Sequence, residues 1–177
     1  MDGFTPAVNN LQPTGVFKVL RSGDETVLIE VNRIKQLRLT NKLKRLEELG
    51  YDLDRGKYIE REALVAYDLE EEWGYLKRYK APEGSGKKGD WIGISGKGAN
   101  KTFDHFGLKD DPMVISNNAN ISKQRAKFFE SLDEHFIKAD YVILDIEYVK
   151  KYNPSFHQEI IDYIVQKFGT TKLIEYR

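Results

Sequence analysis

The sequence predicts an α/β or α+β domain in which helices and strands alternate along the chain. From about residue 58 onward, apolar residues recur in turn at helical and at strand spacing. Near the C-terminus, a strand, a helix and a second strand follow one another at the spacing of a βαβ unit, so the last two strands are expected to be parallel. The hydrophobic content of 40% and the aromatic content of 12% are enough for a packed core, which excludes a disordered chain.

Residues 1–50 are expected to form an N-terminal region made of a leader, a hairpin and a basic helix. Residues 1–14 contain two prolines and a glycine among polar residues, which is typical of a leader or linker. Residues 16–20 and 26–31 are rich in β-branched and apolar side chains and flank a polar turn, which predicts a β-hairpin. Apolar residues at helical spacing predict a helix over residues 32–49, and a helix commonly ends at a residue such as Gly50.

Residues 51–177 are expected to form the main domain, which begins with a turn. Apolar stripes predict its helices, over residues 58–73, 121–136 and 156–168. Short apolar or alternating runs predict its strands, over residues 75–79, 90–95, 101–106, 141–144 and 172–176. Glycine, proline and asparagine predict exposed loops over residues 81–89 and 110–120.

Composition limits the function classes. The length of 177 residues fits one domain with a small N-terminal appendage. No apolar run approaches the ~18 residues of a membrane span, and no signal peptide pattern is seen at the N-terminus. The absence of cysteine excludes disulfides and thiolate chemistry. Basic and acidic residues number 28 each, so only local basic runs, at residues 33–45 and 77–88, favour a phosphate-bearing partner.

Three acidic residues stand where a helix and two strands could bring their carboxylates together. Asp104 interrupts the aromatic strand segment Phe-Asp-His-Phe, and strands disfavour an aspartate that has no task there. Asp90 follows a glycine-rich basic loop and begins a strand. Glu62 lies in the first turns of its helix, where the helix dipole alone would justify an acid. In nucleases, such carboxylates hold a divalent metal ion that activates water and offsets charge on the phosphate.

This ordered set, with the segment Lys138-Ala-Asp-Tyr-Val-Ile-Leu-Asp145, resembles toxin nucleases of the PD-(D/E)XK superfamily. It is most similar to the C-terminal toxin domains of bacterial contact-dependent growth inhibition and related polymorphic toxin systems. Over residues 58–177, the resemblance implies a central mixed β-sheet flanked by helices. It also implies that Glu62, Asp90 and Asp104 bind Mg²⁺, Mn²⁺ or Zn²⁺ and that the domain cleaves DNA or tRNA.

The same resemblance implies a biological setting. The chain would be secreted or delivered as part of a larger bacterial effector and would act in the cytoplasm of the target cell. A cognate immunity protein would neutralise it. Residues 51–177 would then be the nuclease-like catalytic domain.

One position departs from this pattern, which has a lysine two residues after the second strand acid. Here that position is Phe106. Lys101 is expected to act as the catalytic lysine in its place, with Lys97 as the alternative. In a regular strand, however, Lys101 and His105 point to the face opposite Asp104.

Two other functions remain open from the sequence. A metal-independent RNase would use His105 or His157 as an acid or base. A non-catalytic binding or immunity module would carry the acidic residues as surface features. The nuclease predicts converging carboxylates, the metal-independent RNase predicts a histidine paired with lysine or arginine, and the binding module predicts acidic residues that lie apart.

Other polar residues are expected to have structural positions. His135 stands near the end of a helix, where a positive charge matches the helix dipole. Asp140 and Asp145 flank a buried strand and are expected to meet solvent at its two ends.

Overall fold

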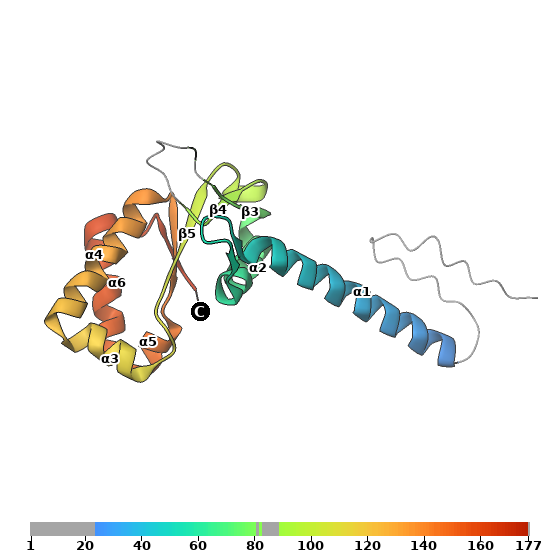
Figure 1. The fold of residues 1–177 in the computed structure, drawn as a ribbon, viewed down its shortest axis with the longest axis horizontal. Coiled ribbons are helices and arrows are strands. Elements are labelled where there is room, and N and C mark those ends of the chain that lie inside the picture. The colour runs from blue at the N-terminus through green and yellow to red at the C-terminus, as the bar shows by residue number, and fades with distance from the viewer. Residues whose placement is uncertain (1–23, 81, 83–88, 177) are drawn as a thin grey trace, which may run out of the picture. The chain divides into compact units, whose positions relative to one another are not determined.

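The computed structural model describes residues 24–80, 82 and 89–176, with side chains from residue 35 onward. Contacts between residues divide the chain into two units, Met1–Asn41 and Lys42–Arg177. Helix α1 (Asp24–Gly50) begins in the first unit and ends in the second (Figure 1). Among the described helices, none is both long enough and apolar enough to cross a membrane.

Helix α1 begins earlier than the sequence predicts. Residues 26–31 are helical, so the strand predicted there is wrong, while residues 1–14 and 16–20 lie outside the described part of the chain. β-Branched residues cost only tenths of a kcal/mol each in a helix, whereas extending an existing helix adds a hydrogen bond for every residue fixed. The helix predicted over residues 32–49, with its end at Gly50, is confirmed.

A small hairpin follows α1, and the turn predicted at residues 51–56 forms its tip, at residues 53–56. Strands β1 (Tyr51–Asp52) and β2 (Lys57–Tyr58) are antiparallel. The Asp52 carboxylate accepts hydrogen bonds from the N–H groups of Asp54 and Arg55, both at 2.9 Å. The turn ends at Gly56, whose φ of 62° favours glycine.

The second unit is built on a five-stranded mixed sheet with the order β3-β4-β5-β6-β7. The strands are β3 (Leu76–Arg78), β4 (Trp91–Gly93), β5 (Thr102–Gly107), β6 (Tyr141–Asp145) and β7 (Leu173–Glu175). Strand β4 is antiparallel to both of its neighbours, β3 and β5, and β5, β6 and β7 are parallel. The predicted fold class and the parallel pairing of the last two strands are therefore confirmed.

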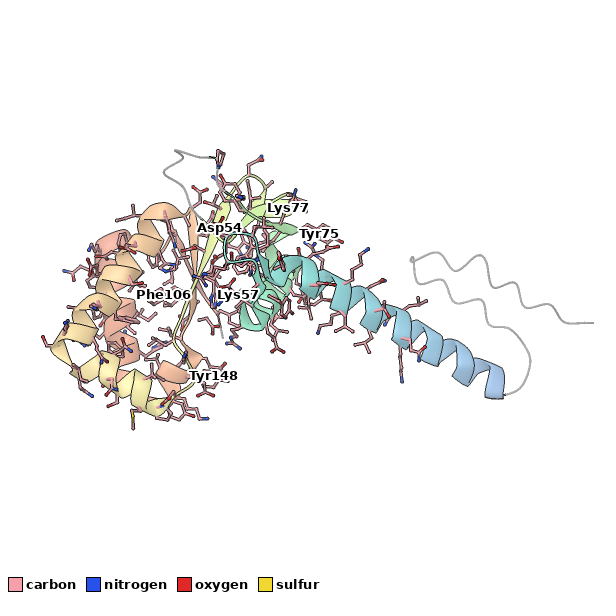
Figure 2. The ribbon with its side chains drawn as sticks, in the orientation of Figure 1. Asp54, Lys57, Tyr75, Lys77, Phe106 and Tyr148 are labelled. Carbon is pink, nitrogen blue, oxygen red and sulfur yellow. The ribbon has the colours of Figure 1, made fainter. Side chains whose placement is uncertain are left out.

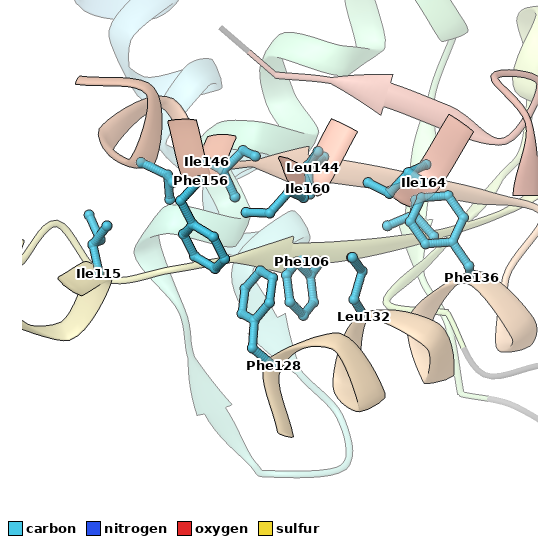
Figure 3. Close-up of a cluster of buried hydrophobic side chains, with 12 residues drawn as sticks. Phe106, Ile115, Phe128, Leu132, Phe136, Leu144, Ile146, Phe156, Ile160 and Ile164 are labelled. Carbon is cyan, nitrogen blue, oxygen red and sulfur yellow. The ribbon is translucent and has the colours of Figure 1, made fainter. Parts of the chain in front are cut away.

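Helices cover both faces of this sheet (Figures 1 and 2). The helices of the second unit, after the end of α1, are α2 (Glu60–Trp73), α3 (Pro112–Asn120), α4 (Ser122–Lys138), α5 (Glu147–Tyr152) and α6 (Pro154–Phe168). Helix α2 packs on one face, and α3 to α6 pack on the other. Strand β6 shows why: Val142 and Leu144 enter the core under α4 and α6 (Leu144 is labelled in Figure 3), while Ile143 enters the core under α2.

Helix α3 corrects the loop predicted over residues 110–120. Asp111 caps the helix, because its carboxylate accepts hydrogen bonds from the N–H groups of Met113 and Val114. Pro112 occupies the first helical position, where a missing N–H costs nothing and the fixed φ favours the helix. The proline that suggested a loop is therefore a helix start. Helix α5 was also not predicted.

Candidate functional site

Glu62 is buried in the first turn of α2, against Arg78 at the end of β3. Arg78 Nη2 donates to Glu62 Oε2 at 2.6 Å, and Arg78 Nε donates to the Leu49 carbonyl at 2.6 Å. The guanidinium group also lies 4.8 Å from the centre of the Trp91 ring. Arg78 thus belongs to the interior and not to the basic surface that the run at residues 77–88 suggested. Because both charges are buried, each depends on the other, and Arg78 fixes the Glu62 carboxylate.

Asp90 lies directly before β4, close to Asp104 of β5. The regular pairing of the two strands ends at Trp91 and Phe103. Asp90 Oδ2 accepts a hydrogen bond from the backbone N–H of His105 at 2.8 Å, which holds Asp90 beside β5. The negative charge of Asp104 is close enough to raise the pKa of Asp90.

The charge state of Asp90 reflects its neighbours. Burial, with the negative charges of Asp104 and Glu62, raises the pKa of Asp90 to about 7. Arg78 Nη1, 4.0 Å from Asp90 Oδ1, lowers the pKa by less than these effects raise it. The Asp90 side chain is 26% exposed, so solvent ions can reach it. Glu62, Asp90 and Asp104 therefore interact electrostatically, and we refer to them as the acid cluster.

Two basic side chains from α4 lie beside Asp104, which is only 2% exposed. His135 Nδ1 lies beside Asp104 Oδ2, and Lys138 Nζ is 3.1 Å from the same oxygen. Both residues stand in the last turn of α4, three positions apart and so on one side of the helix. Asp104 Oδ2 is buried and accepts no hydrogen bond of regular geometry from the described residues. The proximity of His135 to Asp104 was missed from the sequence, because a helix-end histidine has a sufficient explanation in the helix dipole.

Lys138 is the lysine that the structure brings to Asp104, in place of the two that the sequence suggested. Lys101 is exposed and directly precedes β5. Lys97 forms an ion pair with Glu72, and its ammonium group lies 4.0 Å from the centre of the Trp73 ring. Lys138 lies on a helix, 34 positions after Asp104, so a sequence motif defined along one strand does not include it.

The acid cluster fits a divalent ion as a pair of ligands and not as a cage of three. Among the described residues, no group of three or more histidine and acidic side chains is arranged to hold a metal ion. Glu62 is bound by Arg78, whereas Asp90 is 26% exposed and lies close enough to Asp104 for the negative charge of Asp104 to raise its pKa. Mg²⁺ typically takes one or two carboxylates and completes its shell with water and substrate phosphates. The pair suits such an ion.

His105 belongs to a separate cluster with Arg61 and Asp145. Arg61 binds Asp145 through two hydrogen bonds of 2.5 Å, and His105 Nε2 lies 3.0 Å from Asp145 Oδ2. Burial raises the pKa of Asp145, but Arg61 and His105 lower it by more, so the pKa lies below its ordinary value. Asp145 is therefore a buried ion-pair residue, and the prediction that it meets solvent is wrong. Arg61 was not considered from the sequence.

The remaining polar residues have structural partners. Asp140 accepts hydrogen bonds from the Thr102 N–H and hydroxyl at 3.0 and 3.1 Å, so it ties the start of β6 to β5 and does not simply meet solvent. His157 is buried on α6, and its Nε2 lies 3.5 Å from Glu175 Oε1. Neither residue has a described contact with the acid cluster.

Comparisons with known proteins give one structural similarity. No protein-family model matches the sequence, and no curated protein is similar to it. The structure is similar to that of a CdiA-CT toxin from Burkholderia pseudomallei E479, solved in complex with its cognate CdiI immunity protein. The TM-score is 0.46 and the sequence identity is 25%, over 66% of this chain and 97% of that one.

Proposed function

We propose that this protein is a nuclease that cleaves phosphodiester bonds with the help of a divalent metal ion bound by Asp90 and Asp104. The pair Asp90–Asp104 carries this proposal. The two carboxylates lie close enough to repel each other, and this repulsion adds to the burial that raises the pKa of Asp90. A bound cation relieves that repulsion, which gives a physical reason for the pair to exist.

The residues around the pair have distinct tasks in this proposal. Asp90, partly exposed, would be the carboxylate that gives up its proton when the metal ion binds. When bound, the ion would lower the pKa of a water molecule and offset charge on the scissile phosphate. Lys138 and His135 hold the Asp104 carboxylate, and Lys138 supplies positive charge beside it. Arg78 binds Glu62 and so keeps the third carboxylate from adding its full charge to the pair.

The biological setting comes from the sequence resemblance. The nuclease would be the toxin domain of a larger bacterial effector, would cut DNA or tRNA in the cytoplasm of a target cell, and would be neutralised by a cognate immunity protein. This setting is independent of the geometric argument for the metal ion.

A cleavage assay tests the proposed function. The chain is incubated with total tRNA and, separately, with plasmid DNA, in Mg²⁺ or Mn²⁺ and in EDTA. We expect cleavage of one of the two that requires the divalent ion and falls at least about a hundredfold in Asp90→Asn, the size of effect typical for loss of one electrostatic catalytic group. Asp110→Asn, a change of an exposed acid in a loop, is the matched control. Cleavage that survives both EDTA and Asp90→Asn would contradict the proposal.

A metal-independent RNase is the second candidate, and one observation favours it. His135 and Lys138 are a base and an acid beside the same carboxylate, which is a set of groups that cleavage through a 2′-hydroxyl requires. The histidine would then be His135 and not the predicted His105 or His157. Activity on RNA alone, insensitive to EDTA and lost in His135→Gln, would identify this mechanism. A binding module would carry acidic residues that lie apart. Asp104 and Glu62 instead lie close enough to Asp90 to raise its pKa, which does not favour this alternative.

A further inference from the structure

An open cavity of about 420 Å³ lies between β5, α3 and α4, on the same face of the sheet as Asp104. Its apolar wall includes Phe106, Leu108 and Phe128, and its polar groups include Asn118 of α3 with Gln124 and Lys127 of α4. The rings of Phe106 and Phe128 pack edge to face with their centres 5.3 Å apart (Figure 3). The volume falls in the range of small-molecule sites.

The polar groups of the lining match the edge of a nucleobase, which carries hydrogen-bond donors and acceptors that side-chain amides recognise. Phe106 and Phe128 are only 6% and 4% exposed, so they offer a base a small apolar floor and no ring face for stacking. The Asn118 amide is fixed by its Nδ2, which donates to the Val114 carbonyl at 2.9 Å. Gln124 and Lys127 are exposed side chains at the rim of the cavity, where the lysine can meet a phosphate.

The cavity adjoins the acid cluster. On α4, Lys127, Ser131 and His135 are spaced four apart and so follow one side of the helix, from the cavity to Asp104. The Phe106 ring lies 5.0 Å from the His135 ring. On β5, Asp104 and Phe106 share a face two residues apart, which is roughly 6.6 Å along the strand. A nucleotide whose phosphate sits at the acid cluster therefore has the cavity within reach of its own base or of a neighbouring one.

We propose that this cavity binds one unstacked nucleobase next to the scissile phosphate. The inference rests on the proposed function for the position of the phosphate, and it narrows the substrate to a single-stranded or looped segment, because a base inside a duplex stack has no access to such a cavity. Asn118 and Gln124 contact the edge of the base, and Lys127 contacts a flanking phosphate.

Binding of the four ribonucleoside and four deoxyribonucleoside 5′-monophosphates tests the inference without requiring cleavage. Titrations followed by isothermal calorimetry and by NMR shifts use the full chain in EDTA. We expect saturable binding that prefers one base and shifts the amides of α3 and α4. Lys127→Ala weakens binding of all nucleotides about fivefold, and Gln124→Ala or Asn118→Ala reduces the preference among bases. Comparison of the ribose and deoxyribose series distinguishes RNA from DNA as the source of the base.

Matched variants and the cleavage assay separate this inference from the proposed function. Lys150→Ala, a change of an exposed lysine on α5, is expected to bind nucleotides like the wild type. If no nucleotide binds, or if Lys127→Ala and Gln124→Ala bind as well as the wild type, the inference fails even where metal-dependent cleavage occurs. If nucleotides bind at the cavity and nothing is cleaved, the inference about the cavity stands and the proposed function fails. Thermal unfolding of each variant identifies any that do not fold.

Discussion

Asp90 is the residue at which stability and the proposed activity oppose each other. Its carboxylate is partly buried beside two others, so ionising it costs free energy in the folded protein and not in the unfolded chain. The same excess of negative charge is what attracts a cation. Residues of this kind are expected where a site is built for binding at the expense of the fold.

The pH dependence of stability measures this conflict directly. The pKa of Asp90 is about 7 in the folded state, above its value in the unfolded chain. The contribution of Asp90 to the free energy of unfolding is therefore fully present at low pH, and it is lost as the pH rises from about 4 to about 7. Asp90→Asn removes this loss. We expect the variant and the wild type to have similar free energies of unfolding near pH 4, and the variant to be roughly 4 kcal/mol more stable at pH 8. Urea unfolding at several pH values checks this, and a wild type that is the more stable at pH 8 would refute it.

Arg78 is predicted to stabilise the folded state. Arg78→Met leaves Glu62 buried without its partner and is expected to lower the free energy of unfolding by about 3–5 kcal/mol. The matched control is Lys77→Met on the same strand, since Lys77 is exposed (Figure 2) and should change stability by less than about 0.5 kcal/mol. Adding Glu62→Gln to Arg78→Met should recover part of the loss. A loss of equal size in the control and in Arg78→Met would argue against the buried pair.

At the scale of elements, α3 and α4 connect β5 to β6 and supply the cavity, His135 and Lys138. The cap of α3 is therefore expected to affect nucleotide binding from a distance. Asp111→Ala removes the side-chain acceptor of two N–H groups and should cost about 1 kcal/mol, with faster hydrogen exchange in α3. Asp110→Ala, one residue earlier and outside the cap, is the control. Unchanged exchange in Asp111→Ala would show that the cap does not hold the helix.

Some helices and strands could be predicted from the sequence and others could not. The continuous apolar run at residues 141–144 and the stripes of α2, α4 and α6 were predicted correctly, because burial alone sets their periodicity. Helix α3 was missed because Asp-Pro followed by asparagines favours both a turn and a helix start, and only packing of Ile115 into the core selects the helix. Likewise, residues 26–31 have strand propensity, and the adjoining helix overrides it.

For the site, the sequence located the acids but not their partners. Glu62, Asp90 and Asp104 were visible because each carboxylate is unusual for its position or fits a known order. Arg78, Lys138 and His135 come to them from a strand end and a helix end, and charged residues at such ends are ordinary. Their proximity is a property of the tertiary structure, which no local pattern encodes.

At the scale of the whole molecule, a metal ion is expected to act as a stabilising ligand. A ligand that binds only the folded state raises stability with its concentration, by about 2.7 kcal/mol at a hundred times Kd. We expect Mg²⁺ or Mn²⁺ to raise the Tm of the wild type and of Asp110→Asn, and not of Asp90→Asn. The effect should be larger at pH 8 than at pH 6, because protons compete for Asp90. Equal shifts in all three proteins would indicate nonspecific binding.

The outer edge of β3 has a consequence for the self-association of the protein. Leu76 donates its N–H to Glu70 Oε1 at 2.7 Å, and its carbonyl accepts a hydrogen bond from Arg45 Nη2 at 2.5 Å. Arg45 and Glu70 also pair with each other. Side chains thus occupy backbone groups that an incoming strand would need at this edge, which is how natural sheets avoid joining to other chains. Losing either side chain would therefore increase self-association at high protein concentration as well as weakening the fold.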